Sequence, residues 1–310
     1  MEKKLASNRV PAAGRSAAAF LGSPDQRVRW LRRLWGYTTV RGLIGGLLLI
    51  ALIVAALTAP WIAPYDPTKV NGPRAFAAPS ASNWLGTDNL GRDVLSRLIY
   101  GTRVSVQAGF LATTLSFVIG TAIGLVSGFF SGWVDNLLMR FVDAVLAFPS
   151  LVFLIAVTAA LGPSLTNAMI AIGINGFPSF ARLVRGEVLA IRELEYVAAA
   201  RSIGATPLRM MLRHVLPNIT APIIVWISLR IATAILAEAG LSFLGLGVQP
   251  PTPSWGSMIN LGNSYLERAP WIALSSGAAI FVAVLAANLF GDMLRDILDP
   301  RLRGERASGH

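Results

Sequence analysis

Long stretches without charge constrain this chain more than any other feature. A helix that crosses a membrane needs about 20 mostly apolar residues, and several runs here reach that length. They cover residues 42–65, 104–134, 144–181, 215–247 and 269–291, and only Arg230 and Glu238 in the fourth run are charged. The third run is too long for one span, and Gly162-Pro163 divides it. The sequence therefore predicts six transmembrane helices, near 42–62, 104–130, 137–161, 165–185, 218–243 and 269–291.

The composition agrees with an all-α integral membrane protein. Only 14% of the residues are charged, against about 25% in a soluble domain. The absence of cysteine excludes disulfides, thiolate metal sites and cysteine nucleophiles. With only His214 and His310, an imidazole metal site is not expected either. The net charge of +11 lies in blocks between the apolar runs, which is typical of membrane topology rather than of nucleic-acid binding.

Lysine and arginine in the loops predict the orientation. If the N-terminus is cytoplasmic, the inside segments carry 20 basic residues and the outside segments six. Cytoplasmic loops are the ones enriched in basic residues, so both termini are expected inside. A cleaved signal peptide is the alternative for the first run, but about 40 residues precede that run and no clear cleavage site follows it.

These spans divide the chain into five parts. The prediction is a basic cytoplasmic segment at 1–41, a first helix at 42–62, an external loop at 63–103, a core at 104–291 and a cytoplasmic tail at 292–310. Within the first part, residues 27–33 are expected to form a short helix on the inner membrane surface. The core includes a cytoplasmic loop at 192–217.

Glycines recur every fourth residue in the second span, at Gly120, Gly124 and Gly128. On a helix these positions share one face and allow another helix to approach closely. The neighbour is either another helix of this chain or a helix of a partner permease.

Irregular backbone is expected in two places. Pro149 should kink the third span, because proline removes one backbone hydrogen bond. The charges near the start of this span, Asp135, Arg140 and Asp143, fit either an interfacial anchor or a role in gating. Residues 240–255 are rich in glycine and proline and are expected to form an outer gate, a re-entrant turn or a plain external loop.

Arg230 and Glu238 are the two ionisable residues inside the fifth span. Such residues usually face a bundle interior or a water-filled cavity. They are candidates for the translocation path, where they would meet the charged ends of a substrate, or for charge pairing with a partner chain. Direct pairing between them is not expected, because eight residues of helix separate them by about 12 Å.

The segment between the fourth and fifth spans predicts two short helices separated by a turn. Ala198 to Ile203 favour a helix, and Gly204 suits the left-handed position that follows one. Thr206 is a candidate N-cap, with Pro207 at the first position of the next helix.

The second of these helices is amphipathic. Leu208, Met211, Leu212 and Val215 form one apolar stripe, while Arg209 and Arg213 lie on another face. A stripe of this kind fits either a groove of a soluble partner or the inner leaflet of the membrane.

The same segment resembles the EAA loop of ABC-importer permeases. The resemblance rests on Ala198-Ala199-Ala200, on Gly204 and on Leu216-Pro217 at the spacing of that loop, with Ala198 where an acidic residue usually stands. Further stretches match in order: 85–97 (LGTDNLGRDVLSR), 139–143 (MRFVD), 147–149 (AFP), 241–256 (LSFLGLGVQPPTPSWG) and 299–301 (DPR). The similarity covers roughly residues 30–305. The chain is similar to the C-type permeases (DppC/OppC type) of the dipeptide, oligopeptide and nickel importers.

The resemblance implies a MetI-like permease fold in a bacterial inner membrane and a set of partners. These are a homologous B-type permease in a heterodimer, two ATPase subunits that hold ATP and magnesium, and an extracytoplasmic substrate-binding protein. No cofactor is expected in this chain. The loop would be the coupling helix, with Gly204 shaping its bend. From the apolar stripe, Leu208, Met211 and Leu212 are the expected anchors in the ATPase groove.

The substrate implied is a dipeptide or oligopeptide. Nickel complexes, glutathione, opines and sugars are the alternatives within the same branch. An intramembrane enzyme is disfavoured, because the spans offer neither histidine nor a pair of carboxylates. A standalone secondary transporter is disfavoured by the lack of a clear internal repeat. No phosphate-binding glycine-rich motif is present, so any ATPase must be a separate chain.

Overall fold

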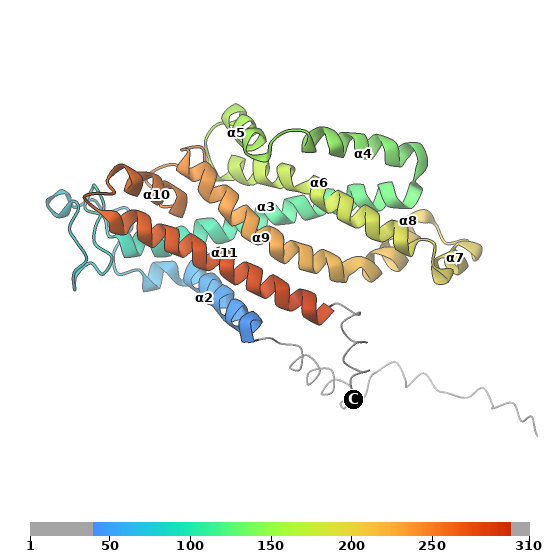
Figure 1. Cartoon of the computed structure of the whole chain (residues 1–310), viewed down its shortest axis with the longest axis horizontal. Helices are drawn as coiled ribbons and strands as arrows, with labels where there is room; N and C mark the ends of the chain where they lie inside the picture. Colours follow the sequence, from blue (N-terminus) through green and yellow to red (C-terminus); the bar gives the residue numbers. More distant parts are fainter. Residues whose placement is uncertain (1–39, 299–310) are drawn as a thin grey trace, which may run out of the picture. The chain divides into compact units, whose positions relative to one another are not determined.

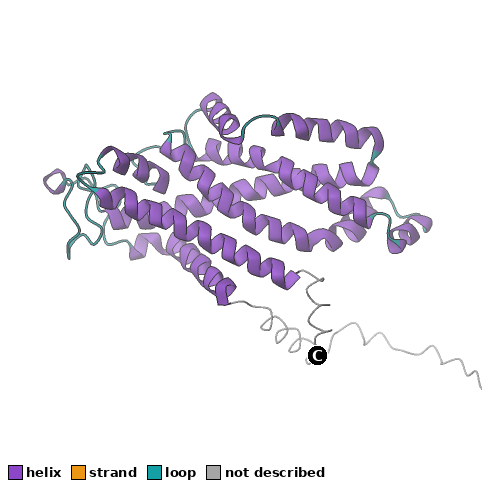
Figure 2. Ribbon diagram, viewed as in Figure 1, coloured by secondary structure: helices purple, strands orange, loops and turns teal. Residues whose placement is uncertain are grey.

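The computed structural model describes residues 40–298, and within that range it contains helices and loops but no strand (Figure 2). The long helices are α2 (Val40–Ile62), α3 (Val94–Phe130), α6 (Leu165–Ile191), α9 (Thr220–Phe243) and α11 (Pro270–Leu298). The shorter elements are η2 (Gly72–Arg74), α4 (Gly132–Leu146), α5 (Ser150–Leu161), α7 (Glu195–Ser202), α8 (Pro207–Met210), η3 (Met211–Val215), η4 (Leu216–Ile219) and α10 (Trp255–Ser264). The expected helix at 27–33 lies outside the described residues.

The long helices run side by side, and the loops gather at their two ends (Figure 1). The loop before α3 and the short helix α10 lie at one end. Helices α7 and α8 lie at the other, and this is called the coupling end below. The arrangement separates two loop regions by the length of the bundle.

Five of the six predicted spans each fall on one helix and the third falls on two, α4 and α5, so the predicted number of six is not confirmed. By length and composition, four helical segments within residues 40–298 are apolar enough to cross a membrane, or five if α4 and α5 together count as one span. The four are 40–62, 94–130, 207–243 and 270–298. Helix α6 is not among them, since it carries two asparagines and several charged residues.

The third span is not a kinked helix. Helices α4 and α5 meet at an angle of 88°, and Pro149 is the residue that precedes α5 rather than one inside a helix. A residue before proline is driven away from helical geometry, and proline cannot donate to the preceding turn. The chain therefore turns a corner here.

Two predicted boundaries are wrong. The external loop was expected to end at residue 103, but α3 begins ten residues earlier, at Val94, where the Asp93 carboxylate accepts a hydrogen bond from the Ser96 N–H at 2.8 Å. At the other end of the core, α11 continues to Leu298 instead of ending near 291. Charged residues marked the limits of the predicted spans, but a helix continues past the apolar region wherever its charges find partners or water.

The core of the bundle is the contact between α3 and α6, the most extensive between any two described elements. A Cβ atom at Gly120 would lie 2.5 Å from the Phe177 carbonyl oxygen, and one at Gly124 would lie 2.6 Å from that of Ala181. A Cβ atom at Gly128 would lie 2.8 Å from the Cβ of Val188. The glycine face therefore packs inside this chain and not against a partner.

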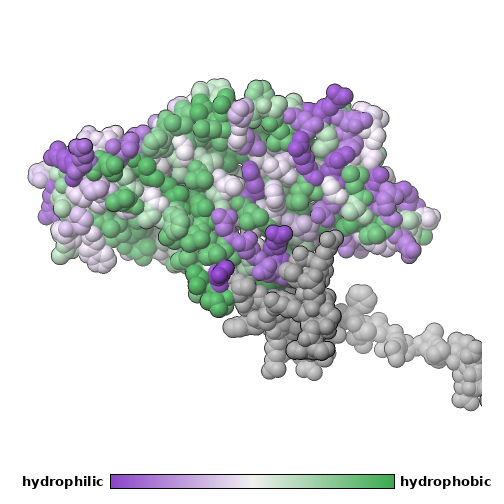
Figure 3. All heavy atoms as spheres, in the orientation of Figure 1, coloured by the Kyte–Doolittle hydropathy of each residue, from purple (hydrophilic) through white to green (hydrophobic). Residues whose placement is uncertain are grey.

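The surface supports a membrane location. A broad apolar area covers the middle of the face in Figure 3, and hydrophilic residues gather toward both of its ends. Exposed apolar side chains include Leu47 and Leu57 on α2 and Phe281 on α11. Trp61 and Trp133, at the ends of α2 and α4, are also exposed, as is common for tryptophans at the membrane surface.

Candidate coupling surface

Residues 192–219 are called the coupling segment below. Its first helix, α7, has a well-formed C-terminal end. Helix α7 stops at Ser202, and Gly204 follows with a φ of +81°. The Gly204 N–H donates to the Arg201 carbonyl at 3.0 Å, and the Ala205 N–H donates to the Ala200 carbonyl at 3.1 Å. This pair of hydrogen bonds defines a Schellman motif, which requires a left-handed residue and favours glycine.

The second helix starts as the sequence predicts. Thr206 is the N-cap of α8, and its hydroxyl accepts a hydrogen bond from the Arg209 N–H at 3.4 Å. Pro207 occupies the first helical position, where its missing N–H costs nothing. Two short helices separated by a turn are therefore confirmed.

The apolar stripe of the second helix is split. After α8 the chain widens into the π-helical turn η3, which rotates the residues that follow relative to an α-helix. Met211 and Val215 are buried, with 8% and 0% of their surface exposed, whereas Leu208 and Leu212 remain 62% and 53% exposed. The expectation that Met211 is an exposed anchor is not met.

The sequence did not single out the most exposed apolar residue of the segment. Ile203 is 86% exposed, because it lies at the tip between α7 and Gly204. Ile203 is the C-cap residue of α7, directly before the left-handed Gly204. That position in the sequence is the feature that indicates an outward-pointing side chain. Ile203, Leu208 and Leu212 are called the apolar tip below, and exposed Arg201, Arg209 and Arg213 flank them.

The remaining predicted loop residues divide by exposure. Those exposed are Ala198, Ala199, Gly204, Pro207 and Pro217. Ala200 is buried and Leu216 is partly buried. The buried positions hold the segment to the bundle, and the exposed ones are available to another molecule.

Apolar contacts tie the coupling segment to the spans. Val215 and Ile219 are fully buried in a cluster with Leu125 of α3 and with Val184 and Val188 of α6. A movement of this segment must therefore carry the ends of α3 and α6 with it.

Arginines of α6 and the adjoining Arg192 form further polar contacts with the bundle. Arg185 forms a two-pronged ion pair with Asp135 of α4, with both N–O distances 2.6 Å. Arg192 donates to the Gly128 carbonyl at 3.0 Å and to the Ser131 hydroxyl. Of the three charged residues near the start of the third predicted span, Asp135 thus forms a contact within this chain. Asp143 pairs with Arg182 at the surface.

Arg230 lies between three helices. A Cβ atom at Gly176 of α6 would lie 2.4 Å from the Arg230 Nη2 and 2.2 Å from the Ser116 Oγ of α3. The guanidinium thus occupies space that the glycine leaves free. Within the described part of the chain, no carboxylate lies within 4 Å of the Arg230 guanidinium.

Glu238 does not line an accessible path. Its side chain is fully buried, and its Oε1 accepts a hydrogen bond from Ser242 Oγ at 2.6 Å. The same Ser242 oxygen accepts from the Val248 N–H at 3.3 Å, which holds the glycine-rich loop after α9 against the helix. Glu238 is thus held inside the described bundle through Ser242, and no ion pair joins it to Arg230 there.

The opposite end of the bundle is a folded cap. Asp88 pairs with Arg92 at 2.7 Å and with Arg97 at 3.5 Å, and all three are nearly buried. The Trp271 indole of α11 donates to the Thr87 carbonyl at 3.1 Å. The sequence placed this stretch in the expected external loop at 63–103, and the buried ion pairs explain its charges.

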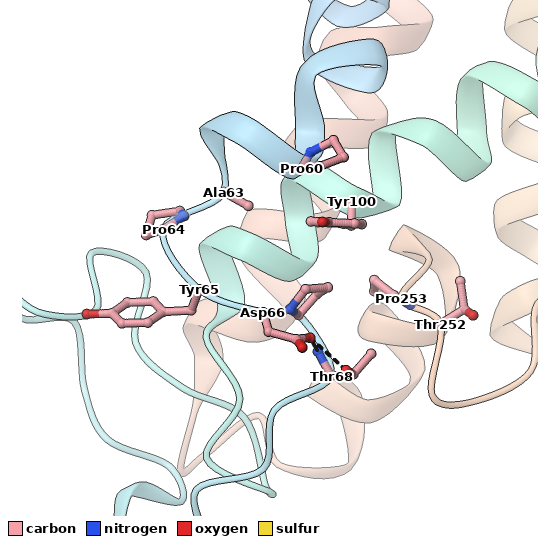
Figure 4. Close-up of a pocket in the computed structure, with 10 residues that line it drawn as sticks. Pro60, Ala63, Pro64, Tyr65, Asp66, Thr68, Tyr100, Thr252 and Pro253 are labelled. Carbon is pink, nitrogen blue, oxygen red and sulfur yellow. Dashed lines mark hydrogen bonds between the residues drawn. The ribbon is translucent and has the colours of Figure 1, made fainter.

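A pocket of about 570 Å³ opens beside this cap (Figure 4). Tyr100 of α3, Pro253 and the loop 63–68 line it. In that loop, hydrogen bonds from the Thr68 hydroxyl at 2.6 Å and the Thr68 N–H at 2.8 Å hold the pKa of Asp66 below its usual range. The pocket therefore carries an ionised carboxylate at neutral pH.

Comparison with known proteins decides what this helical bundle is. The family described as "binding-protein-dependent transport system inner membrane component" matches residues 120–304, more than half of the chain. The chain belongs to this family. A second model, the N-terminal transmembrane domain of oligopeptide transport permease C, matches residues 41–79 of this permease. Among the described residues, no group of His, Cys, Asp and Glu could hold a metal ion.

Named relatives are similar over most of their length. The permease is 43% identical to the glutathione transport system permease protein GsiD of Pectobacterium atrosepticum, over 88% of this chain and 90% of the relative. It is also 43% identical to the dipeptide transport system permease protein DppC of Alkalihalophilus pseudofirmus, over 84% and 86%.

Solved structures agree on the fold. The inward-facing MetNI methionine ABC transporter superposes with a TM-score of 0.54 at 17% identity, covering 65% of this chain and 96% of that one. An amino acid ABC transporter solved with histidines gives 0.50 at 20% identity, over 64% and 92%. The protein is thus a multi-pass permease subunit of an ABC importer and not an enzyme. Members of this family work with a paired permease, partner ATPases that hydrolyse ATP and a substrate-binding protein.

Proposed function

We propose that this permease forms half of a path for small peptides and is driven through residues 192–217, which dock on an ATPase subunit. The observation that carries the proposal is the apolar tip. Three large apolar side chains stand exposed on a folded, hydrogen-bonded helix–turn–helix, not on a loose loop. Exposed apolar residues ringed by polar ones are typical of a protein–protein contact.

The helix–turn–helix favours a protein partner over the inner leaflet. The tip is flanked by three exposed arginines, and its turn is fixed by the Schellman motif at Gly204. A preformed shape lowers the entropy lost on docking. Val215 and Ile219 then transmit the movement of the docked segment to α3 and α6, so that the spans rock as packed units.

Arg230 is our candidate for the translocation path. It lies in the membrane-spanning part of α9, at the meeting of α3, α6 and α9, and lacks a counter-charge in the described chain. An unpaired charge at such depth is costly, and an anionic group such as a peptide carboxylate would offset that cost. Charge pairing with the second permease is the other candidate role.

The substrate class follows from the relatives. One is named as a dipeptide and another as a glutathione transport permease, and glutathione is itself a tripeptide. Peptides are therefore the proposed cargo. Nickel complexes, opines and sugars are the alternatives.

The partners and the orientation complete the proposal. The second permease would be of B type, two ATPases would hold ATP and magnesium, and both termini and the coupling end would be cytoplasmic. The excess of basic residues in the inside segments supports that orientation.

The test is to charge the apolar tip and measure which subunits co-purify in mild detergent. Ile203→Asp and Leu208→Asp should each lower the ATPase recovered with the permease by about tenfold, since an interface anchor contributes more than about 1 kcal/mol. Leu266→Asp is the matched control, because this leucine is 49% exposed in the turn between α10 and α11. Undiminished recovery with both tip variants would contradict the proposal.

A further inference from the structure

A cavity of about 660 Å³ lies at the coupling end between α6, α9 and α11. Its lining includes Asn218, near the end of the coupling segment, and Arg295 in the last turn of α11. Its volume is within the range of pockets that bind small molecules, about 300–1,000 Å³. Neither the coupling contact nor the folded cap uses it.

The cavity carries one charge of each sign, Glu187 on α6 and Arg295 on α11. In the described chain neither side chain forms an ion pair or a hydrogen bond. Both side chains therefore line the same cavity without forming an ion pair with each other.

Other charged residues of α6 behave differently. Arg182, Arg185 and the adjoining Arg192 each pair with an acidic residue, at 2.6 to 2.8 Å. The same helix that pairs its other charges thus leaves Glu187 open toward the cavity. An unpaired carboxylate near a membrane is unfavourable unless a cation or water meets it.

The rest of the lining is largely apolar, with one unsatisfied donor. Val225 and Leu229 of α9 provide aliphatic walls. Trp226 also lines the cavity, and its indole Nε1 is buried without a hydrogen-bond acceptor in the described structure. Because this nitrogen is itself buried, Trp226 adds its apolar ring surface to the wall.

We propose that this cavity binds a small zwitterionic peptide, with its ammonium group at Glu187, its carboxylate at Arg295 and its apolar side chains against Val225 and Leu229. Opposite charges at separate points of one cavity match a ligand that carries both, and each lone charge then gains a partner. The inference rests on the proposed function for its peptide. It adds a site on the coupling side, separate from Arg230.

The site has a mechanical consequence. A bound peptide bridges α6 and α11 beside the first turn of α9, which continues directly from the coupling segment. It thereby resists the relative movement of these helices.

The test uses the importer complex purified with its partners, freed of the binding protein, in nanodiscs. Leucyl-leucine, its N-acetyl derivative and its C-terminal amide are titrated by calorimetry. The free dipeptide should bind about two- to fivefold more tightly than either blocked form, the effect of one partly exposed charge pair. Glu187→Gln should remove the difference between free and acetylated peptide only, and Arg295→Gln the difference between free and amidated peptide only.

Matched controls are Glu193→Gln, just after α6, and Asp292→Asn, one turn before Arg295. Neither lines the cavity, so both should retain the full pattern. Three results would overturn the inference. They are equal binding of the three peptides, a loss of peptide binding in the variants without this charge-specific pattern, and a loss of peptide binding when the nanodisc contains phosphatidylethanolamine. If ATPase activity still responds to the binding protein in that case, the proposed function stands and only the cavity site is lost.

Discussion

Asp135 and Asp143 lie on α4, and each forms an ion pair with an arginine of α6. The two pairs differ in how far their side chains are exposed to solvent. The Asp135 side chain is 12% exposed and its pair with Arg185 is two-pronged. The Asp143 and Arg182 side chains are each 57% exposed and joined by one contact. Because screening by solvent weakens surface pairs, only the first pair is expected to hold α4 against α6.

Asp135→Asn should therefore lower the stability of the permease by about 1–3 kcal/mol, since it leaves Arg185 without its charged partner. Asp143→Asn should change it by less than about 0.5 kcal/mol. The measurement is the thermal unfolding midpoint of the purified complex. Equal shifts in the two variants would show that the pair is not a structural tie.

Arg230 gives a second prediction at the level of one side chain. If it meets a substrate carboxylate, Arg230→Gln should reduce uptake of a dipeptide roughly tenfold, which corresponds to about 1.4 kcal/mol, and Arg230→Lys should restore part of it. Uptake into vesicles is measured with free and C-terminally amidated dipeptide. An equal loss for both substrates would indicate a structural role, such as pairing with the second permease.

Individual residues of the coupling segment were partly predictable. Gly204, Thr206 and Pro207 follow local rules of helix ends, and the structure confirms all three positions. The exposure of Ile203 and the burial of Met211 did not follow from spacing. A π-helical turn shifts the register of an apolar stripe, and no residue type in 211–215 marks that shift.

At the level of helices, the pair α3–α6 is the structural centre of the described bundle. Its glycines bring the two backbones so close that even one added methyl group has no room. Helix association within a membrane relies on packing because lipid is as apolar as the side chains. These positions therefore stabilise the pair that carries the coupling segment.

Gly124→Ala should destabilise the permease by about 1–3 kcal/mol, the usual cost of overpacking, because its Cβ would lie 2.6 Å from the Ala181 carbonyl oxygen. Gly186→Ala, on α6, is the matched control, since nothing lies within 4 Å of the added atom. It should be neutral or stabilising by up to about 1 kcal/mol, because alanine is the better helix former. Thermal unfolding distinguishes the two, and a destabilising Gly186→Ala would argue against packing as the cause.

The helices themselves were predictable where apolar runs are long, and their ends were not. Charge marks the edge of a span in sequence, yet α3 starts ten residues before the predicted edge because Asp88 neutralises Arg92 and Arg97 there. Similarly, Pro149 indicated a bend, but a sequence pattern does not give the 88° turn between α4 and α5. The ion pairs of Arg92 and Arg97 and the size of the turn are features of the folded chain, which the pattern of apolar residues does not contain.

On the scale of the whole bundle, function depends on the two ends. The coupling segment lies at one end and the folded cap with α10 at the other (Figure 1). Between them α6 and α9 run from end to end, and α6 and α9 flank the coupling segment in sequence. A movement at the apolar tip therefore has a direct route through two helices to the opposite end.

The lack of cysteine in this chain allows the most direct measurement of that coupling. A single cysteine at Ala205, in the turn of the coupling segment, is crosslinked in the intact complex, and the attached protein is identified. A cysteine at Leu266 is the control at the opposite end. We predict that Ala205→Cys captures an ATPase subunit and Leu266→Cys does not. Labelling of Ala205→Cys only by lipid-phase reagents, with no ATPase attached, would contradict the account and make the segment a helix on the membrane surface.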